Sequence, residues 1–519
     1  MTASATGAIE IGATADVVEA ATPLTPALRP IGRDAVIYGI GNVMRRAASL
    51  VMLPVYTRLL TPRDYGLLQM LDMTVDVAAI LMSAGMTAGV MRFYFKANTE
   101  RARREVVVTA TWLVLSLNAA GAILLSLGAG PIHEHVLGRA GAPFYVYIAA
   151  ANFALGQLLT MPMLLMQIQG RAKLFSIVSI VQLISQLSIN ILLLVVFHLG
   201  PLGILISTLV TNLAVGGAAS VWMLRQVGVR PSVKALRDLR RFGVPYQVAT
   251  AATFVLQFGD RFFLEAHRGL AAVGLYALAY QFAFLVDQVG TGPFMRAWQP
   301  RRFANLRASR EIRERDDNVA LHALTITVVS VCLGEVLFVR LGLRLIAGPA
   351  FFGAAGLVPF VVAAFVFQAW GTVVQFGIDA AEKTRYNAAV MWVSAALILV
   401  LYAVLIPLYG AYGAGMATLI SFAFRTALLS YFSNRVWPHS YDWLPQLRIL
   451  AVAVVISSVS WIVTVDRLRD EAALGALLYG VWLVYLWYFE LPTSAREIVR
   501  ARVGDFGARL RPRLVESSK

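Results

Sequence analysis

Two adjacent arginines, Arg45 and Arg46, stand in the middle of the apolar stretch IYGIGNVMRRAASLVMLPVY at residues 37–56. The stretch is long enough to cross a membrane as a helix. A charged side chain at the centre of such a helix costs about 2.5–3.5 kcal/mol, whereas each Leu, Ile or Val returns only about 0.3–0.6 kcal/mol. Cations at this depth therefore have a function or a buried partner. Asn42 shares a polar stripe with Arg45 at helical spacing.

Carboxylates form a second set of candidate residues. Asp72 and Asp76 share one face of an apolar segment with Gln69, and Asp287 lies in a later apolar segment that also carries two tyrosines. A carboxylate inside a membrane protein either carries a coupling proton or forms a fixed pair with a cation, and both interpretations stay open here. Further charges within apolar segments are Arg92, Asp260, Arg261 and Arg425. Because Arg92 closes its segment, snorkelling to the interface explains it equally well.

The composition indicates that these charges belong to a membrane protein. Of 519 residues, 58% are hydrophobic and 14% charged, whereas soluble proteins have about 25% charged residues. Apolar runs of about 20 residues recur from end to end, which predicts an all-α integral membrane protein with about 14 transmembrane helices. The predicted spans are 35–58, 65–92, 106–128, 144–168, 175–198, 203–224, 243–265, 272–295, 318–342, 356–379, 387–408, 412–433, 448–465 and 472–490.

The loops between these spans differ sharply in charge. When Arg58, Arg340 and Arg448 at the span ends are counted with the adjacent loops, 32 of the 45 Lys and Arg residues belong to the even-numbered loops and the termini, 8 belong to the odd-numbered loops, and five lie within spans. The positive-inside rule then places both termini in the cytoplasm of an inner-membrane, multi-pass protein. The net charge of +16 needs no nucleic-acid partner, since anionic lipid headgroups attract such loops.

The sequence also contains an internal repeat. The segments that begin at Leu199 and Tyr409 share two glycines and a threonine at an offset of 210 residues, and Gly66 matches Gly274 at an offset of 208. We therefore expect two parallel six-helix repeats plus two C-terminal helices, with tight backbone reversals at the shared glycines. The predicted parts are a disordered cytoplasmic tail (1–33), an N-terminal lobe (34–224), a cytoplasmic linker (225–242), a C-terminal lobe (243–434), two additional helices (435–491) and a basic cytoplasmic tail (492–519).

Several enzyme signatures are missing from the sequence. It has no GxxxxGK[ST] phosphate-binding loop, no HExxH or CxxC motif, and no cluster of its six histidines at ligand spacing. The single cysteine, Cys332, cannot form an intrachain disulfide. We therefore expect a two-lobed transporter that is not an enzyme, needs no cofactor and holds no metal.

Two stretches carry a family resemblance. The segment RLLTPRDYGLLQM at residues 58–70, after the first span, and GMTAGVMRFY at residues 85–94 resemble the polysaccharide-transport branch of the MOP exporter superfamily. The resemblance covers residues 33–490. It implies a flippase that moves an undecaprenyl-diphosphate-linked oligosaccharide between leaflets by alternating access, for exopolysaccharide, O-antigen or capsule synthesis. Its implied partners are that lipid-linked substrate, membrane lipids, a polysaccharide polymerase and glycosyltransferases.

The resemblance also suggests a role for the cations of the first span. A diphosphate is a dense anion, and arginine binds phosphate through a planar fork of donors while keeping its charge when buried. We expect Arg45, Arg46 and Asn42, together with the cations of the other spans, to border the substrate cavity. The alternative is a structural ion pair. At the level of function, a multidrug or cation-coupled exporter of the same superfamily is the second hypothesis, for which an acidic cavity is expected.

Overall fold

A computed structural model of the chain describes residues 52–83, 85–138, 142–463, 467–491 and 496. The described residues are mainly helical and contain no β-strand, which confirms the predicted all-α fold. Twelve of their helical segments are long and apolar enough to cross a membrane. The predicted span 35–58 lies largely outside the described residues, so a count of fourteen stays a prediction.

One other predicted span, 243–265, is not among the twelve. It corresponds to the end of helix α10 (Val233–Phe258) and to helix α11 (Asp260–Arg268), which meet at Gly259. The polar start of α10 and the charged start of α11 explain this result, because they leave too short an apolar window between them.

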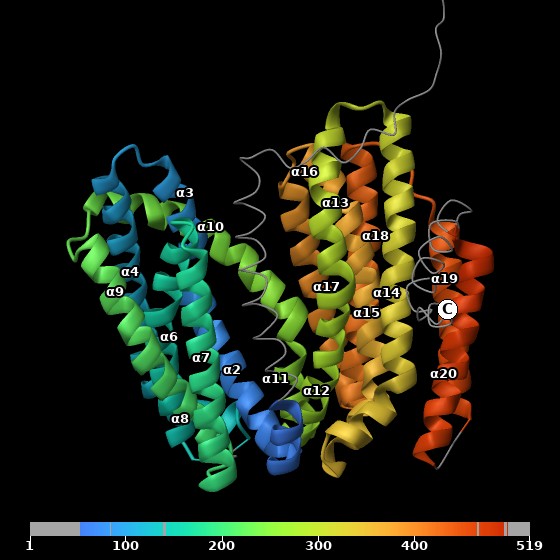
Figure 1. Ribbon diagram of the computed structural model, residues 1–519, viewed down its shortest axis with the longest axis horizontal. Coiled ribbons are helices and arrows are strands. Elements are labelled where there is room, and N and C mark those ends of the chain that lie inside the picture. Colours follow the sequence, from blue (N-terminus) through green and yellow to red (C-terminus); the bar gives the residue numbers. More distant parts are fainter. Residues whose placement is uncertain (1–51, 84, 139–141, 464–466, 492–495, 497–519) are drawn as a thin grey trace, which may run out of the picture.

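The helices form two groups, which Figure 1 shows on either side of α10. The first group consists of α2 (Pro62–Ser83), α3 (Met86–Lys96), α4 (Glu100–Leu127), α5 (Ala129–His135), α6 (Phe144–Ile168), α7 (Ala172–Ile191), α8 (Pro201–Thr211) and α9 (Gly217–Val227). The second group consists of α11, α12 (Leu270–Val286), α13 (Gly292–Ala304), α14 (Arg310–Ile346), the 3₁₀ segment η5 (Pro349–Leu357), α15 (Val358–Val374), α16 (Phe376–Ala380), α17 (Arg385–Tyr409) and α18 (Ala411–Val436). Two more helices, α19 (Trp443–Ile462) and α20 (Leu468–Tyr485), pack against α14.

The two groups meet where α2 packs on α12, at the lower end of the view in Figure 1. Gly66 and Gly274 form the contact. A Cβ atom on Gly66 would lie 1.9 Å from the carbonyl oxygen of Leu270, and one on Gly274 would lie 1.9 Å from the carbonyl oxygen of Pro62. Only glycine permits this approach of two backbones. The two residues that were matched by sequence offset therefore touch each other.

The predicted tight reversals are confirmed at both repeat positions. Gly200 precedes α8 with φ 55° and ψ −138°, and Gly410 precedes α18 with φ 59° and ψ −132°. Both lie in a region of backbone space that favours glycine. The threonines that follow also correspond, since Thr208 and Thr418 each donate a hydrogen bond to the carbonyl oxygen four residues earlier at 3.0 Å.

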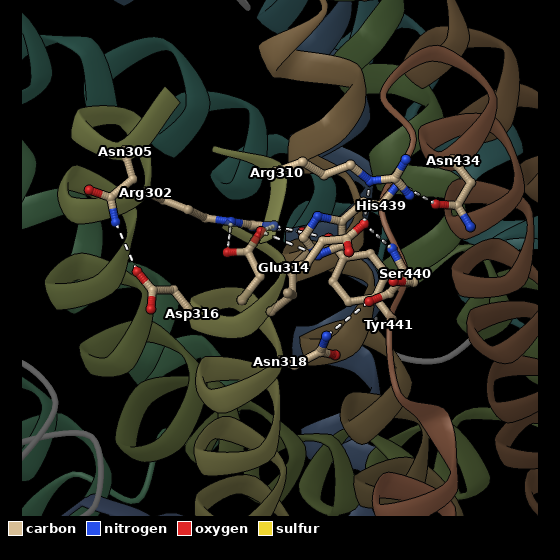
Figure 2. A network of polar contacts seen from close by, with 12 residues as sticks. Arg302, Asn305, Arg310, Glu314, Asp316, Asn318, Asn434, His439, Ser440 and Tyr441 are labelled. Atoms are coloured by element: carbon tan, nitrogen blue, oxygen red, sulfur yellow. Dashed lines mark hydrogen bonds and ion pairs between the residues drawn. The ribbon is translucent and has the colours of Figure 1, made fainter. Parts of the chain in front are cut away.

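A buried polar network fixes the connection between α18 and α19 to the second group (Figure 2). Arg302 on α13 donates to both carboxylate oxygens of Asp317 at 2.7 and 3.0 Å, to the carbonyl oxygen of Val373 at 2.7 Å and to the hydroxyl of Tyr441 at 3.0 Å. The backbone amide of Ser440 donates to Glu314 at 3.0 Å. The additional helices are therefore held by hydrogen bonds as well as by apolar packing.

Candidate functional site

A cavity of about 680 Å³ lies between α2, α3, α6 and α10. Its apolar lining includes Met91, Phe254 and Phe258. The polar lining residues are Asp76, Thr87, Gln157, Thr160, Thr250, Thr253 and Gln257. A large, mainly apolar cavity with a few polar groups is typical of a ligand-binding site.

Asp76 is the only charged residue in the described lining of this cavity. It lies one turn after Asp72 on α2, and both side chains are exposed rather than packed against a neighbouring helix. The closed contact at Gly66 precedes Asp76 by ten residues on the same helix, or roughly 15 Å at 1.5 Å per residue. The cavity and the contact that closes one end of the molecule are thus separate features of α2.

Asp260 and Arg261 form a buried ion pair next to the cavity. Arg261 donates to Asp260 at 2.7 Å and to the carbonyl oxygen of Gln257 at 3.1 Å. Its guanidinium also lies over the ring of Tyr280, 4.4 Å from the centroid. Gln257 and Phe258, the last two residues of α10, line the cavity, so the ion pair holds the chain at the point where α10 passes into α11.

The other predicted residues are spread over several elements. Arg92 is exposed on α3, and Asp287 is half-buried in the π-helical turn that follows α12. Arg425 is half-buried on α18, where its Nε atom has no hydrogen-bond partner among the described residues. None of these three lines the cavity in the part of the chain described here. Arg45, Arg46 and Asn42 lie outside the described residues.

Polar side chains on α7 form hydrogen bonds to other segments of the first group and to Tyr56. Gln186 donates to Thr208 on α8 at 3.1 Å, and Asn190 donates to the hydroxyl of Tyr56 at 2.9 Å. Ser207 in turn donates to Asn190. These hydrogen bonds satisfy polar side chains within the membrane segment, which is a common role of such residues in membrane helices.

Sequence reasoning missed Glu335, a carboxylate on α14. Within the described structure, neither of its carboxylate oxygens has a hydrogen-bond partner, although both are buried. Its signal was present, because it is a single acidic residue in the otherwise apolar run VVSVCLGEVLFV. An ionisable residue inside a membrane segment is a candidate functional residue on this ground alone.

The helical architecture and the mainly apolar cavity with a few polar groups are those of a polytopic membrane protein of the transporter type. The chain belongs to the polysaccharide biosynthesis protein family, whose family model matches residues 31–306. No curated protein matches it. The family match confirms the resemblance to the polysaccharide branch that was read from the sequence.

Solved structures of the MOP superfamily share the fold. A lipid II flippase MurJ in an inward closed conformation is 11% identical over 87% of this chain and 99% of that chain, with a TM-score of 0.69. An inward-facing multidrug resistance MATE family transporter is 13% identical over 77% of this chain and 97% of that chain, with a TM-score of 0.57. An outward-facing MATE transporter is 13% identical over 78% and 94%, with a TM-score of 0.51.

Proposed function

We propose that this protein is an alternating-access flippase that moves a polyprenyl-diphosphate-linked oligosaccharide across the bacterial inner membrane. Family membership and the flippase-like fold support the reaction class. The observation that carries the proposal further is the cavity between α2, α3, α6 and α10. Its amides, hydroxyls and carboxylate are the groups that bind sugar hydroxyls, and its phenylalanines offer apolar faces to sugar rings.

The position of the cavity supports an inward-facing state. With both termini in the cytoplasm, as the distribution of Lys and Arg predicts, α2 runs from the outer side towards the cytoplasm. The Gly66–Gly274 contact then closes the outer end, while Asp76 lies about two to three turns closer to the cytoplasm. A substrate synthesised on the cytoplasmic leaflet would enter this state before it is released outside.

The diphosphate is assigned to Arg45 and Arg46. These arginines belong to the predicted first span, which precedes α2 in the chain. Removing one cation should weaken substrate retention by about 1.5–3 kcal/mol, the typical contribution of a hydrogen bond to a charged group. Arg→Ala also removes a costly group from the membrane, so membrane abundance should stay normal or rise.

Complementation of a flippase-null strain tests the proposal, with export divided by membrane abundance. The substitution Gln157→Leu removes an amide from the cavity on α6, and Gln167→Leu is the matched control because it lies on the same helix, exposed and outside the cavity. We expect reduced export for Gln157→Leu and for the double change Arg45→Ala with Arg46→Ala, and normal export for the control. Normal export by both test variants would refute the proposal.

One observation favours the second hypothesis, a cation exporter. Asp76 is the only charged residue in the described lining of the cavity, and a carboxylate attracts cationic substrates. The two functions predict different phenotypes. Expression of a cation exporter would raise the resistance of a drug-sensitive strain to cationic dyes, and Asp76→Asn would abolish this gain. A flippase would give no resistance and would restore polysaccharide in the null strain.

A further inference from the structure

A second cavity, of about 290 Å³, lies where α14 meets α19 and α20. Near the end of α14 it is lined by Arg340 and Arg344, and the other helices contribute Trp461 and Glu471. It shares no lining residue with the cavity described above. Helix α14 ends here and continues into η5, whose Phe351 contacts Tyr65 on α2. The second cavity therefore lies towards the end of the molecule at which the two helix groups meet.

Arg340 is poised to bind an anion. Its guanidinium carbon lies 3.7 Å from the centre of the Trp461 ring, which fixes the planar group by stacking. In the described structure no carboxylate or carbonyl accepts a hydrogen bond from Arg340, although the side chain is half-buried. A guanidinium carries five N–H donors. Stacking uses the face of the group and leaves these donors at its edge unpaired.

Arg344, one turn further along α14, carries the second cation of the cavity. It forms an ion pair with Glu471 on α20, with 3.0 Å between Nη1 and Oε2. Two guanidinium groups thus face one carboxylate in the described lining, so the described residues supply one more positive than negative charge there. A half-buried cation without a counter-ion is costly near the membrane, and a bound anion removes that cost.

We propose that this cavity binds a phosphate group, and that the phosphate belongs to a membrane lipid. Arginine forks match phosphate oxygens, and basic pockets between membrane helices bind anionic headgroups. The surroundings favour a lipid over free phosphate, because large apolar side chains are exposed on the same ends of the helices. Leu345 is 60% exposed, Ile462 79% and Leu468 42%, which gives acyl chains a surface to cover. The headgroup then lies in the cavity while its chains lie along α14, α19 and α20.

The inference does not depend on the proposed function. A lipid phosphate site on these helices would exist in a flippase and in a cation exporter alike, because it involves none of the residues assigned to substrate. Its failure would leave the flippase proposal unchanged, and failed complementation would leave the lipid site unchanged.

Native mass spectrometry of the purified, full-length protein tests the site. The probe is phosphatidylglycerol, titrated against wild-type protein, Arg340→Gln and the control Arg268→Gln. Arg268 is an exposed arginine that donates to the carbonyl oxygen of Pro407 and lies outside the second cavity. We expect Arg340→Gln to bind the tightest phosphatidylglycerol at least tenfold more weakly and the control to bind as the wild type does. Equal binding by Arg340→Gln and the wild type would overturn the proposal.

Two further measurements test the lipid site without relying on Arg340→Gln. Glu471→Gln releases Arg344 from its ion pair and should make phosphatidylglycerol binding tighter, whereas a purely structural pair predicts unchanged or weaker binding. The second measurement is competition between inorganic phosphate and the bound phosphatidylglycerol. We expect inorganic phosphate not to displace the lipid at millimolar concentration, since it has no chains to contact the apolar helix surface. Displacement by inorganic phosphate would overturn the lipid assignment and leave a site for free phosphate.

Discussion

An alanine in place of Gly66 is expected to open the end of the molecule at which α2 meets α12. The new Cβ would lie 1.9 Å from the carbonyl oxygen of Leu270 and 2.8 Å from its carbonyl carbon. Ordinary van der Waals contact begins at 3.4 Å, so the two helices must separate by roughly 1.5 Å at this point. The obstacle is backbone, which cannot rotate away as a side chain does. Gly274→Ala meets the carbonyl oxygen of Pro62 at the same distance and should act in the same way.

The size of the effect follows from the cost of overpacking. Forcing a methyl group into a closed contact costs about 1–3 kcal/mol. This cost applies only while α2 and α12 are in contact, and it vanishes in any conformation in which they have parted. The equilibrium between the two conformations should therefore shift by about 5- to 150-fold towards the parted one, since 1.4 kcal/mol corresponds to a factor of ten.

Cysteine labelling measures this shift. Cys332 is buried, with its sulfur 3.5 Å from the carbonyl oxygen of Val362, so Cys332→Ser supplies a silent background. Leu270 is 5% exposed, and Leu270→Cys reports on the closed end through its reaction with a membrane-impermeant maleimide. Labelling should accelerate with Gly66→Ala and not with Gly480→Ala, which adds a methyl group to open space on α20. Equal labelling rates in these two variants would refute the proposed closure.

Three further predictions concern stability and topology. Arg302→Ala leaves a buried carboxylate unpaired and should lower the free energy of unfolding by about 3–5 kcal/mol, whereas Arg310→Ala breaks an exposed pair and should cost less than about 1 kcal/mol in the same unfolding experiment. Burial lowers the pKa of His439 in the α18–α19 connection, so the folded state favours the neutral ring. Its stabilising effect should be complete above the unfolded pKa of about 6.5 and should be lost as pH falls below it; thermal unfolding of His439→Gln should lack this dependence. The charged groups around His439 are Arg302, Arg313, Glu314 and Asp317. A cysteine at Gly353, which is exposed in η5, should react with an impermeant maleimide from outside intact cells, and labelling only from the cytoplasmic side would reverse the predicted orientation.

The sequence predicted the features that depend on local pattern. Apolar run length identified the membrane helices, because a span must satisfy its backbone hydrogen bonds within one helix. The glycine offsets predicted two equivalent turns, and Gly200 and Gly410 have nearly the same backbone angles. Arg261 was singled out as a charge within an apolar segment, and it is buried as expected of such a residue.

What the sequence could not show are partners far apart in the chain. Arg302 lies between the predicted spans 272–295 and 318–342, yet it is buried and bound to Asp317, Val373 and Tyr441. No periodicity connects these positions, since they come from α14, α15 and the α18–α19 connection. A substrate cavity was expected from the sequence, but its lining by α6 and by the end of α10 depends on how helices pack. The pairing of Asp260 with its own neighbour Arg261 depends on rotamers and not on spacing.

The geometry of the Gly66–Gly274 contact bears on how the two helix groups move. Gly66 faces Leu270 and Gly274 faces Pro62, and both Pro62–Leu270 and Gly66–Gly274 are separated by 208 residues. The contact therefore maps onto itself when one half of the predicted repeat is exchanged for the other, which supports the repeat and places its axis between these two glycines. A motion of one half against the other separates both members of the contact at once. Such a separation also exposes apolar side chains beside the two glycines, because Leu67, Met70, Leu270 and Val273 are buried in one cluster, so the parted conformation must recover this burial at the opposite end of the molecule.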